Sequence, residues 1–239
     1  MQTATYISLS AQKALESGID VAANNLANLS TPAFKGENVL FKEYLQTAPG
    51  GGNISYVRDF GVQRDTKQGD LAKTGNPLDT GIDGDGYYTI GTSDGQRYTR
   101  NGRFQLDSGG NLVTSQGYQL LSDQGNPITM PANTRQITIS TDGQVSTETG
   151  PVAKIGLAHF DKPQDLVPAS DGLYATEDQP APDTTSKVRQ GTVENSNVNA
   201  IGAISKLLAL QKAYAGAAEI VNDEDNRIKS AIDKLSRVV

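Results

Sequence analysis

Apolar residues near the N-terminus recur at spacings of four and three. They are Leu15, Ile19, Ala22, Leu26 and Leu29. This pattern predicts one amphipathic α-helix over residues 3–29. Pro32 disfavours helical geometry in the residue before it, so we expect the helix to end near Leu29 or Ser30. Gly18 lies inside the helix, where a glycine costs up to about 1 kcal/mol relative to alanine.

A second apolar seam runs through the C-terminal 40 or so residues, again with alternating spacings of three and four. It comprises Ala200, Ala203, Leu207, Leu210, Tyr214, Ala217, Val221, Glu224, Ile228, Ala231, Leu235 and Val238. Only the glutamate breaks the apolar rule. A heptad seam of this length predicts one long helix that packs in the manner of a coiled coil. We expect Ser196 or Asn197 to cap its start.

The middle of the chain has the pattern of short strands. Turn signals such as "SDGQ" at 93, "DSGGN" at 107 and "TDGQ" at 141 separate β-branched and aromatic stretches. This alternation predicts a β-rich domain over residues 76–196. Residues 46–56 form a Gly-rich stretch, and we expect residues 31–75 to be an extended linker segment. The predicted fold class is α+β, with residues 1–30 and 197–239 forming a helical assembly domain.

Both helices carry small or apolar residues beside their main stripes. These are Ala23, Ala27, Ile204, Leu208, Ala218, Ile220 and Ile232. Pairing the two helices with each other would leave these residues exposed. We therefore expect further helices from other copies of the chain to cover them, in a coiled-coil-like bundle. The alternative is an ordinary helix hairpin within one chain.

Composition removes several classes of function. The net charge is −6 without a Lys/Arg cluster, so no nucleic-acid partner is expected. The chain has no cysteine and a single histidine, His159, which excludes thiolate sites and a His-pair metal site. No apolar run is long enough to span a bilayer, so no membrane insertion is expected. The opening residues also lack the regions of a secretory signal.

The best candidate for a metal site is the segment "GIDGDGYYTI". Placing Gly86 at the sixth position of a calcium loop puts Gly81 at the first position and Thr92 at the twelfth. Two required oxygen ligands are then missing, so we interpret the segment as a turn before a strand. No phosphate-binding loop and no nucleophile elbow is present. We expect no catalytic residue, no metal and no cofactor.

Four segments, in order along nearly the whole chain, resemble the bacterial flagellar rod and hook proteins. They are "AANNLANLSTPAFKG" at 22–36, "QGDLAKTGNPLDTGIDGDGYYTI" at 68–90, "YTRNGRFQLDSGGNLVTSQGYQLL" at 98–121 and "QGTVENSNVNAIGAISKLLALQKAYAGAAEIV" at 190–221. Ala33 stands where the family has Gly before Phe-Lys. Within the family the chain is most similar to the proximal rod proteins, with distal rod and hook proteins as the alternatives. In another class, an extracellular calcium-binding adhesin remains an alternative.

The resemblance implies a structural subunit of the flagellar rod and no enzymatic activity. It implies export by the flagellar type III apparatus and helical polymerisation with other copies and other rod proteins. The terminal helices would form an inner tube with the β-rich domain outside, and the rod would carry motor torque across the periplasm. In such a tube, we hypothesise that Asn24, Asn25 and Asn28 fix register between packed helices. The alternative is that Asn28 only ends the helix and the other two face solvent.

The predicted assembly interface follows from these stripes and from the first motif. It comprises Leu15, Ile19, Ala22, Asn24, Asn25, Leu26, Asn28, Leu29, Phe34, Leu207, Leu210, Tyr214, Ala217, Val221, Ile228 and Leu235.

Overall fold

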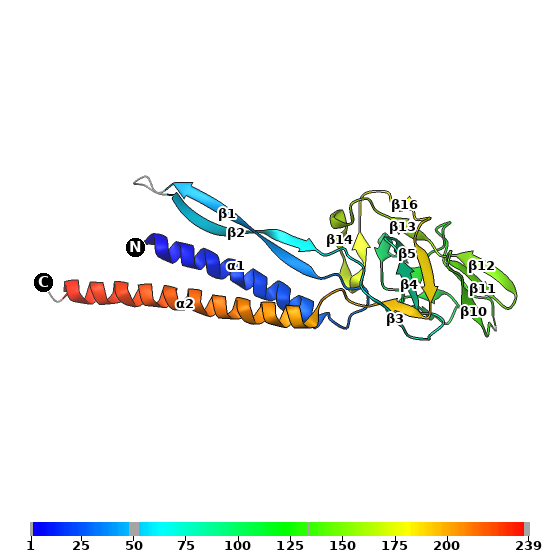
Figure 1. The fold of residues 1–239 in the computed structure, drawn as a ribbon. Helices are drawn as coiled ribbons and strands as arrows, with labels where there is room; N and C mark the ends of the chain where they lie inside the picture. The colour runs from blue at the N-terminus through cyan, green and yellow to red at the C-terminus, as the bar shows by residue number, and fades with distance from the viewer. Residues whose placement is uncertain (1, 48–52, 133, 237–239) are drawn as a thin grey trace. The chain divides into compact units, whose positions relative to one another are not determined.

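The computed structural model describes residues 2–47, 53–132 and 134–236. It confirms a mixed α and β fold, with one helix at each end and strands between them (Figure 1). The chain divides into two compact units. We call the first the helical unit; it comprises residues 1–29, 36–65 and 198–239. The second, the β unit, comprises residues 30–35 and 66–197.

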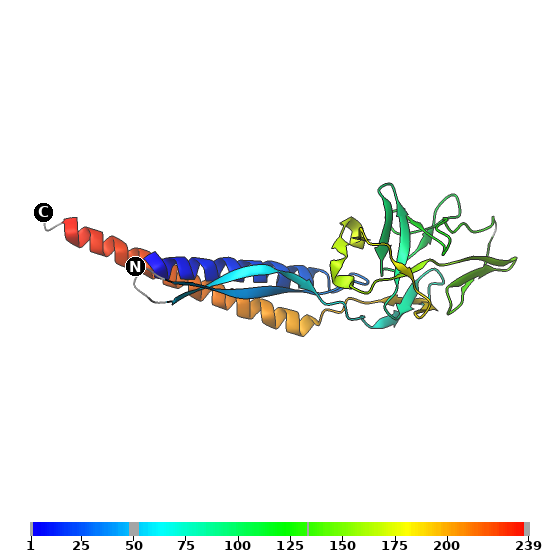
Figure 2. The same cartoon turned by 90° about the horizontal axis from the view of Figure 1, so that it is seen from above.

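The helical unit contains two helices and one β-hairpin. The helices are α1 (Gln2–Ala27) and α2 (Ala200–Ser236), and the hairpin strands are β1 (Glu37–Thr47) and β2 (Asn53–Arg64). Helix α1 contacts α2 and both strands of the hairpin, and Figures 1 and 2 show it lying beside them. The helices run antiparallel, since the start of α1 and the end of α2 lie at the same end of this unit (Figure 1).

Small side chains allow α1 to approach its neighbours closely. From Ile7 onward, where its side chains are described, the buried positions are Ala14, Gly18, Ala22 and Asn25. A Cβ atom at Gly18 would lie 3.3 Å from Cδ2 of Leu210 and 3.7 Å from Cζ of Phe41. The glycine that the sequence marks as a flaw in the helix is therefore the point where α2 and β1 meet α1. Its cost to the helix is offset by the packing it permits.

The cap of helix α2 lies two residues after Asn197 and three after Ser196, the two predicted caps. Asn199 lies immediately before its first residue, and its Oδ1 accepts a hydrogen bond from the backbone N–H of Gly202 at 2.9 Å. An asparagine that accepts from the third residue of a helix satisfies one of the free N–H groups at the helix start. The cap is thus Asn199, in place of the expected Ser196 or Asn197.

The structure differs from the expected linker at residues 31–75. Strands β1 and β2 pair antiparallel along their whole length, from Glu37 opposite Arg64 to Thr47 opposite Asn53. The register shifts between Leu40 and Phe41, as at a β-bulge. Gly61, the partner of Leu40 beside this shift, has a φ of 131°, which glycine adopts and other residues rarely do. The hairpin belongs to the helical unit, and residues 66–75 belong to the β unit.

The β unit is built from short strands. In chain order they are β3 (Leu71–Lys73), β4 (Thr80–Asp83), β5 (Tyr87–Thr92), β6 (Gly95–Thr99), β7 (Gln105–Leu106), β8 (Leu112–Val113), β9 (Gln119–Leu120), β10 (Ile137–Ile139), β11 (Gln144–Thr147), β12 (Gly150–Lys154), β13 (Leu157–His159), β14 (Val167–Pro168), β15 (Tyr174–Ala175), β16 (Ala181–Pro182), β17 (Lys187–Gln190) and β18 (Thr192–Glu194). Two 3₁₀ turns, Pro163–Asp165 and Ser170–Gly172, flank β14.

The largest sheet has the order β14-β15-β6-β5-β9-β8-β7, with β13 joining β5 and β16 joining β13. A three-stranded sheet has the order β10-β11-β12. The last two strands, β17 and β18, pair with β4 and β3. The end of the β unit thus closes onto its beginning. The core between these sheets includes Tyr88, Ile90, Leu120 and Val145, each completely buried.

Two motif glycines are required by close backbone approach. A Cβ atom at Gly69 would overlap the carbonyl oxygen of Asn195, and one at Gly102 would overlap that of Thr80. Ala33, which stands where the family has glycine, has a φ of 59° and is buried. This left-handed conformation costs a non-glycine residue on the order of 1 kcal/mol.

Candidate assembly surface and the buried charge cluster

The predicted interface residues of α1 lie at different depths in the helical unit. Ala22 and Asn25 are buried and Asn24 is exposed. The remaining α1 positions of the set are half-buried: Leu15, Ile19, Leu26, together with Asn28 and Leu29 at the end of the helix. Phe34 is half-buried and belongs to the β unit. The structure therefore does not bring all of these residues onto one surface.

The predicted seam of α2 is its less exposed stripe. Leu207, Leu210, Ala217, Val221 and Ile228 are half-buried, and Tyr214 is 37% exposed. The side chain of Leu235 lies outside the part of the chain that the structure describes.

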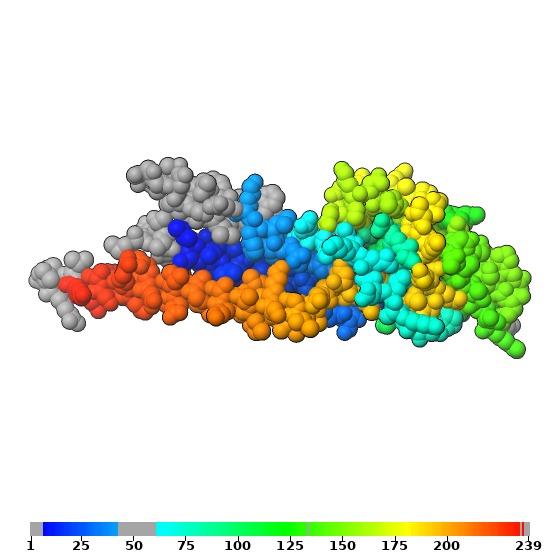
Figure 3. Space-filling view, in the orientation of Figure 1, coloured from blue at the N-terminus to red at the C-terminus, as the bar shows by residue number. Residues whose placement is uncertain are grey.

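Large apolar side chains remain open to solvent on the other faces of α2. The exposed fractions are 79% for Ile201, 45% for Ile204, 60% for Leu208, 57% for Ile220 and 59% for Ile232. Figure 3 shows α2 lying open along the face turned to the viewer. Contiguous exposed apolar patches are typical of interaction surfaces. The expectation that helix pairing leaves Ile204, Leu208, Ile220 and Ile232 uncovered agrees with these values, whereas Ala218 is half-buried.

The three asparagines at the C-terminal end of α1 differ in their contacts. The side-chain amide of Asn25 donates to the carbonyl oxygen of Glu37 at 2.7 Å and accepts from its N–H at 2.8 Å. It thereby imitates a strand residue and fixes the start of β1 to α1. The amide of Asn28 donates to the backbone oxygen of Asn24 at 3.0 Å and to its Oδ1 at 2.8 Å, at the end of the helix. Asn25 is thus used within the chain, which the helical pattern alone does not reveal.

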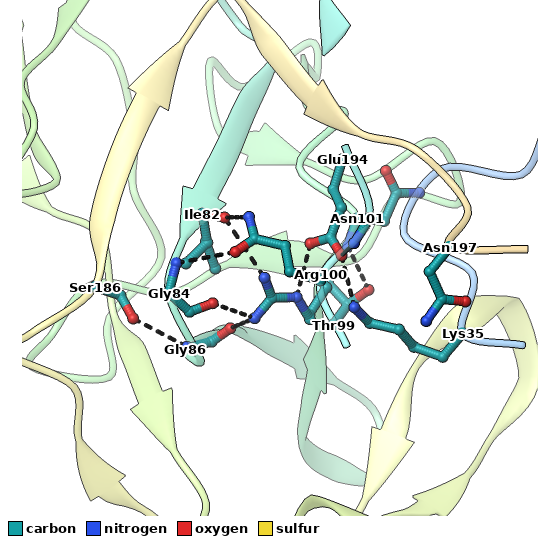
Figure 4. A network of polar contacts seen from close by, with 12 residues as sticks. Lys35, Ile82, Gly84, Gly86, Thr99, Arg100, Asn101, Ser186, Glu194 and Asn197 are labelled. Atoms are coloured by element: carbon teal, nitrogen blue, oxygen red, sulfur yellow. Dashed lines mark hydrogen bonds and ion pairs between the residues drawn. The ribbon is translucent and has the colours of Figure 1, made fainter. Parts of the chain in front are cut away.

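A cluster of three charged residues lies in the interior of the β unit (Figure 4). Nζ of Lys35 is 2.6 Å from Oε1 of Glu194, and Nε of Arg100 is 2.7 Å from Oε2 of the same carboxylate. The three side chains are between 0% and 4% exposed. We call this set the buried charge cluster. It joins segments that are as much as 159 residues apart in sequence.

Backbone groups complete the hydrogen bonds of the cluster. The N–H of Gly69 donates to Oε1 of Glu194, and Nζ of Lys35 donates to the carbonyl oxygen of Lys67 at 2.7 Å. Nη1 of Arg100 donates to the carbonyl oxygens of Gly84 at 2.9 Å and Gly86 at 2.8 Å. Two cations face one carboxylate, and the extra positive charge is met by carbonyl dipoles. Buried ions persist only with such complete pairing.

The segments considered in the sequence for metal binding or catalysis lie in strands and the turns between them. Gly81 and Asp83 lie in β4, and Thr92 ends β5, so "GIDGDGYYTI" is a turn between strands. His159 ends strand β13. Among the described residues, no group of three or more acidic or histidine side chains is placed to hold a metal ion. No described helix is long and apolar enough to cross a membrane.

Three families of sequences match this chain in successive parts. Residues 6–35 match "Flagella basal body rod protein", and residues 81–147 match "Flagellar hook protein FlgE/F/G D1 domain". Residues 189–234 match "Flagellar basal body rod FlgEFG protein C-terminal". The rod protein FlgF of Caulobacter vibrioides is 34% identical over 244 residues, covering 100% of both chains. The chain belongs to the flagellar basal-body rod protein family.

Further relatives place it near FlgF. FlgF of Rhizobium meliloti is 36% identical over 239 residues and 98% of both chains. The rod protein FlgG of Bacillus subtilis is 29% identical over 261 residues, covering 98% of this chain and 99% of the relative. The chain is therefore a FlgF-like structural subunit of the flagellar rod, and its relatives are structural proteins, not enzymes.

The buried charge cluster draws one residue from each matched part. Lys35 ends the first match, Arg100 lies in the second and Glu194 lies in the third. Sequence reasoning missed the cluster because nothing in a local pattern pairs residues so far apart. The available signal was that each is a charged residue inside one of the four resembling segments.

Proposed function

We propose that this chain builds the proximal part of the flagellar rod by polymerising helically through its helical unit. The helical unit then serves as the assembly domain, and α1 and α2 form a coiled-coil-like bundle with the helices of neighbouring copies and of other rod proteins. The polymer carries motor torque across the periplasm, and each subunit reaches it through the flagellar type III export apparatus. Distal rod or hook is the alternative position within the same family. The relatives support a rod subunit and not the calcium-binding adhesin.

The observation that carries this proposal is the open apolar surface of α2. A monomer gains nothing by exposing Ile201, Leu208 and Ile232 at 59% or more. Burial of one large aliphatic side chain contributes about 1.5–3 kcal/mol, so covering several in a polymer supplies a substantial driving force.

The difference in length between the helices points the same way. Helix α1 has 26 residues and α2 has 37, so α1 covers only part of the seam of its antiparallel partner. The seam continues to Ile228 and beyond, without a change in its spacing. Helices from other copies are the simplest cover for this remaining stretch.

Replacement of Leu210 by aspartate tests the proposal. Leu210 packs against Gly18 in the seam, and a carboxylate there opposes burial between helices. We expect the β unit to stay folded, shown by unchanged amide exchange in its core, and rod assembly and motility to be lost. Gln211→Asp, an exposed neighbour with the same change in charge, is the control and should leave motility intact.

A motile Leu210→Asp strain would refute assembly through this seam. Mass spectrometry of purified basal bodies, separated into rod and hook-filament fractions, tests the position independently. Presence in the rod fraction after the hook is removed supports a rod subunit. Absence from both fractions would overturn it.

A further inference from the structure

The segments that leave α1 and enter α2 meet inside the β unit. The N–H of Ala33 donates to the carbonyl oxygen of Glu194 at 2.8 Å, and the N–H of Asn197 donates to that of Phe34 at 3.2 Å. These bonds pair the two connecting segments directly, although the hairpin and most of the β unit lie between them in the sequence.

Side chains lock this pairing. The Lys35–Glu194 ion pair joins the same two segments, with both side chains at most 2% exposed. The carbonyl oxygen of Lys67 accepts from Nζ of Lys35 at 2.7 Å and from Nδ2 of Asn197 at 2.9 Å. A third segment is therefore tied to the same point. We call residues 33–35, 67 and 194–197 the junction.

Matched positions of the two helices lie at nearly equal sequence distances from the junction. Helix α1 ends six residues before Ala33, and α2 starts six residues after Glu194. Gly18 precedes Ala33 by 15 residues, and its packing partner Leu210 follows Glu194 by 16. The antiparallel helices are thus matched at almost equal distances from the bonded pair, as the two arms of a hairpin are matched from its turn.

The helices themselves specify this match weakly. The buried positions Ala14, Gly18 and Ala22 of α1 follow one another every four residues, and all are small. Sliding α1 by four residues, about 6 Å at 1.5 Å per residue, replaces one small residue by another against α2. Packing at the seam therefore penalises such a slip little, and another contact has to select the register.

We propose that the buried Lys35–Glu194 pair sets the register of α1 against α2, in the role that a tight turn has in a hairpin. Fixing register is the best-attested use of buried polar groups, since an unpaired buried charge excludes every alternative pairing. A one-turn slip that pulled either connecting segment would separate Lys35 from Glu194 and leave the Lys35 ammonium group buried without its counter-charge, while Glu194 keeps its pair with Arg100. The register of the helices in turn decides which apolar residues of α2 remain open.

Distances between spin labels test the proposal in the full-length single chain. The chain has no cysteine, so Ala23→Cys and Ser230→Cys on exposed positions of α1 and α2 take labels at those sites alone. Pulsed electron resonance should give one narrow distance in the parent. Lys35→Met should add a second population displaced by about 6 Å, one slip of four residues. This variant leaves the neutral Arg100–Glu194 pair in place, so the β unit should stay folded.

Arg189→Met is the matched control, because it removes a cation from an exposed ion pair with Asp83 in the same unit. It should leave the distance unchanged. Amide exchange of the β core reports whether Lys35→Met keeps that unit folded. If it does not, Asn197→Ala, which removes the bond to Lys67, decides with a smaller second population.

A broad parent distribution, or a Lys35→Met distribution equal to the parent, would overturn the proposal. So would an unchanged distance in Asn197→Ala where Lys35→Met unfolds the β unit. The measurement uses unassembled chains, so its outcome does not depend on polymerisation. The register can prove independent of Lys35 although the rod assembles, and it can depend on Lys35 although the chain does not polymerise.

Discussion

The two units of this chain bury their side chains in opposite ways. Among the side chains that the structure describes, every large one that is under 2% exposed belongs to the β unit, including Tyr88, Ile128 and Glu194. Of the exposed large hydrophobic residues in the described part of the chain, all but Leu106 and Val167 belong to the helical unit. The β unit buries its own core within one chain, and the helical unit leaves apolar side chains exposed. Under the proposed function, stability and assembly are divided between these two parts.

The strongest way to break this comparison is to remove the carboxylate of the buried charge cluster. Glu194→Gln leaves Lys35 and Arg100 buried without an opposing charge. We expect the free energy of unfolding of the β unit to fall by about 3–5 kcal/mol. Chemical denaturation followed by amide exchange in the β core measures it.

The control for this variant is Asp83→Asn, which breaks the exposed pair with Arg189 in the same unit. An exposed pair contributes about 0–1 kcal/mol, so the effect should be small. Equal losses in the two variants would contradict the role assigned to the cluster.

A smaller effect, confined to the helical unit, follows from crowding Gly18. Gly18→Leu forces a side chain into the space held by Leu210 and Phe41, and overpacking of this kind costs about 1–3 kcal/mol. Protection of α1 amides against exchange should fall while that of the β core stays unchanged. Gly18→Ala is the matched control, because its single methyl group is offset by better helix propensity. A fall in β-core protection would show that the two units are not independent.

Alkaline pH should lower the free energy of unfolding of the β unit through the buried Tyr88 phenol. Burial raises the pKa of the Tyr88 phenol well above its ordinary value of 10.0, against smaller opposite effects of the Thr80 hydrogen bond and the Arg100 charge. The folded state then holds this proton more tightly, so its contribution is fully present below pH 10 and is lost above it. The free energy of unfolding should fall by about 1.4 kcal/mol per pH unit beyond 10 on account of this group.

Tyr88→Phe isolates this contribution. It removes one buried hydrogen bond, 2.8 Å long, to Thr80 and should flatten the loss above pH 10 relative to the parent. Identical alkaline slopes in the two proteins, measured by denaturation at several pH values, would contradict the assignment.

The smallest expected effect is a gain in stability. Ala33→Gly relieves the left-handed conformation at φ 59°, and the net benefit is at most about 1 kcal/mol because glycine also adds freedom to the unfolded chain. The midpoint of denaturation of the β unit should rise slightly. Ala72→Gly in strand β3, where no positive φ is needed, should lower it.

Local patterns predicted the elements that depend on local physics. The helical stripes through Leu15 and Leu210 and the turn-separated strands follow from periodicity, and α1 and α2 lie where the stripes place them. The hairpin at 37–64 was not predicted, because a Gly-rich stretch between its two strands favoured the prediction of a linker. Its attachment depends on Asn25, whose partner Glu37 lies outside the helix.

The cluster and the junction were missed for a different reason. The partners of Glu194 lie 159 and 94 residues away, and no propensity or spacing links such positions. The resemblance of the segments that contain Lys35, Arg100 and Glu194 marked these places as important. It did not indicate that the three side chains meet.

Two parts of the chain lie between α1 and α2 in the sequence, the hairpin and the larger segment 67–197, and the two ends of each lie close together. The N–H of Asp65 donates to the carbonyl oxygen of Gly36 at 2.7 Å across the base of the hairpin. Asn197 is likewise a single hydrogen bond from Lys67 across the base of the larger segment. When the two ends of an inserted segment lie side by side, its length can change, or another segment can replace it, without altering the path of the chain between the helices. The same helix pair can therefore carry inserted parts of very different size.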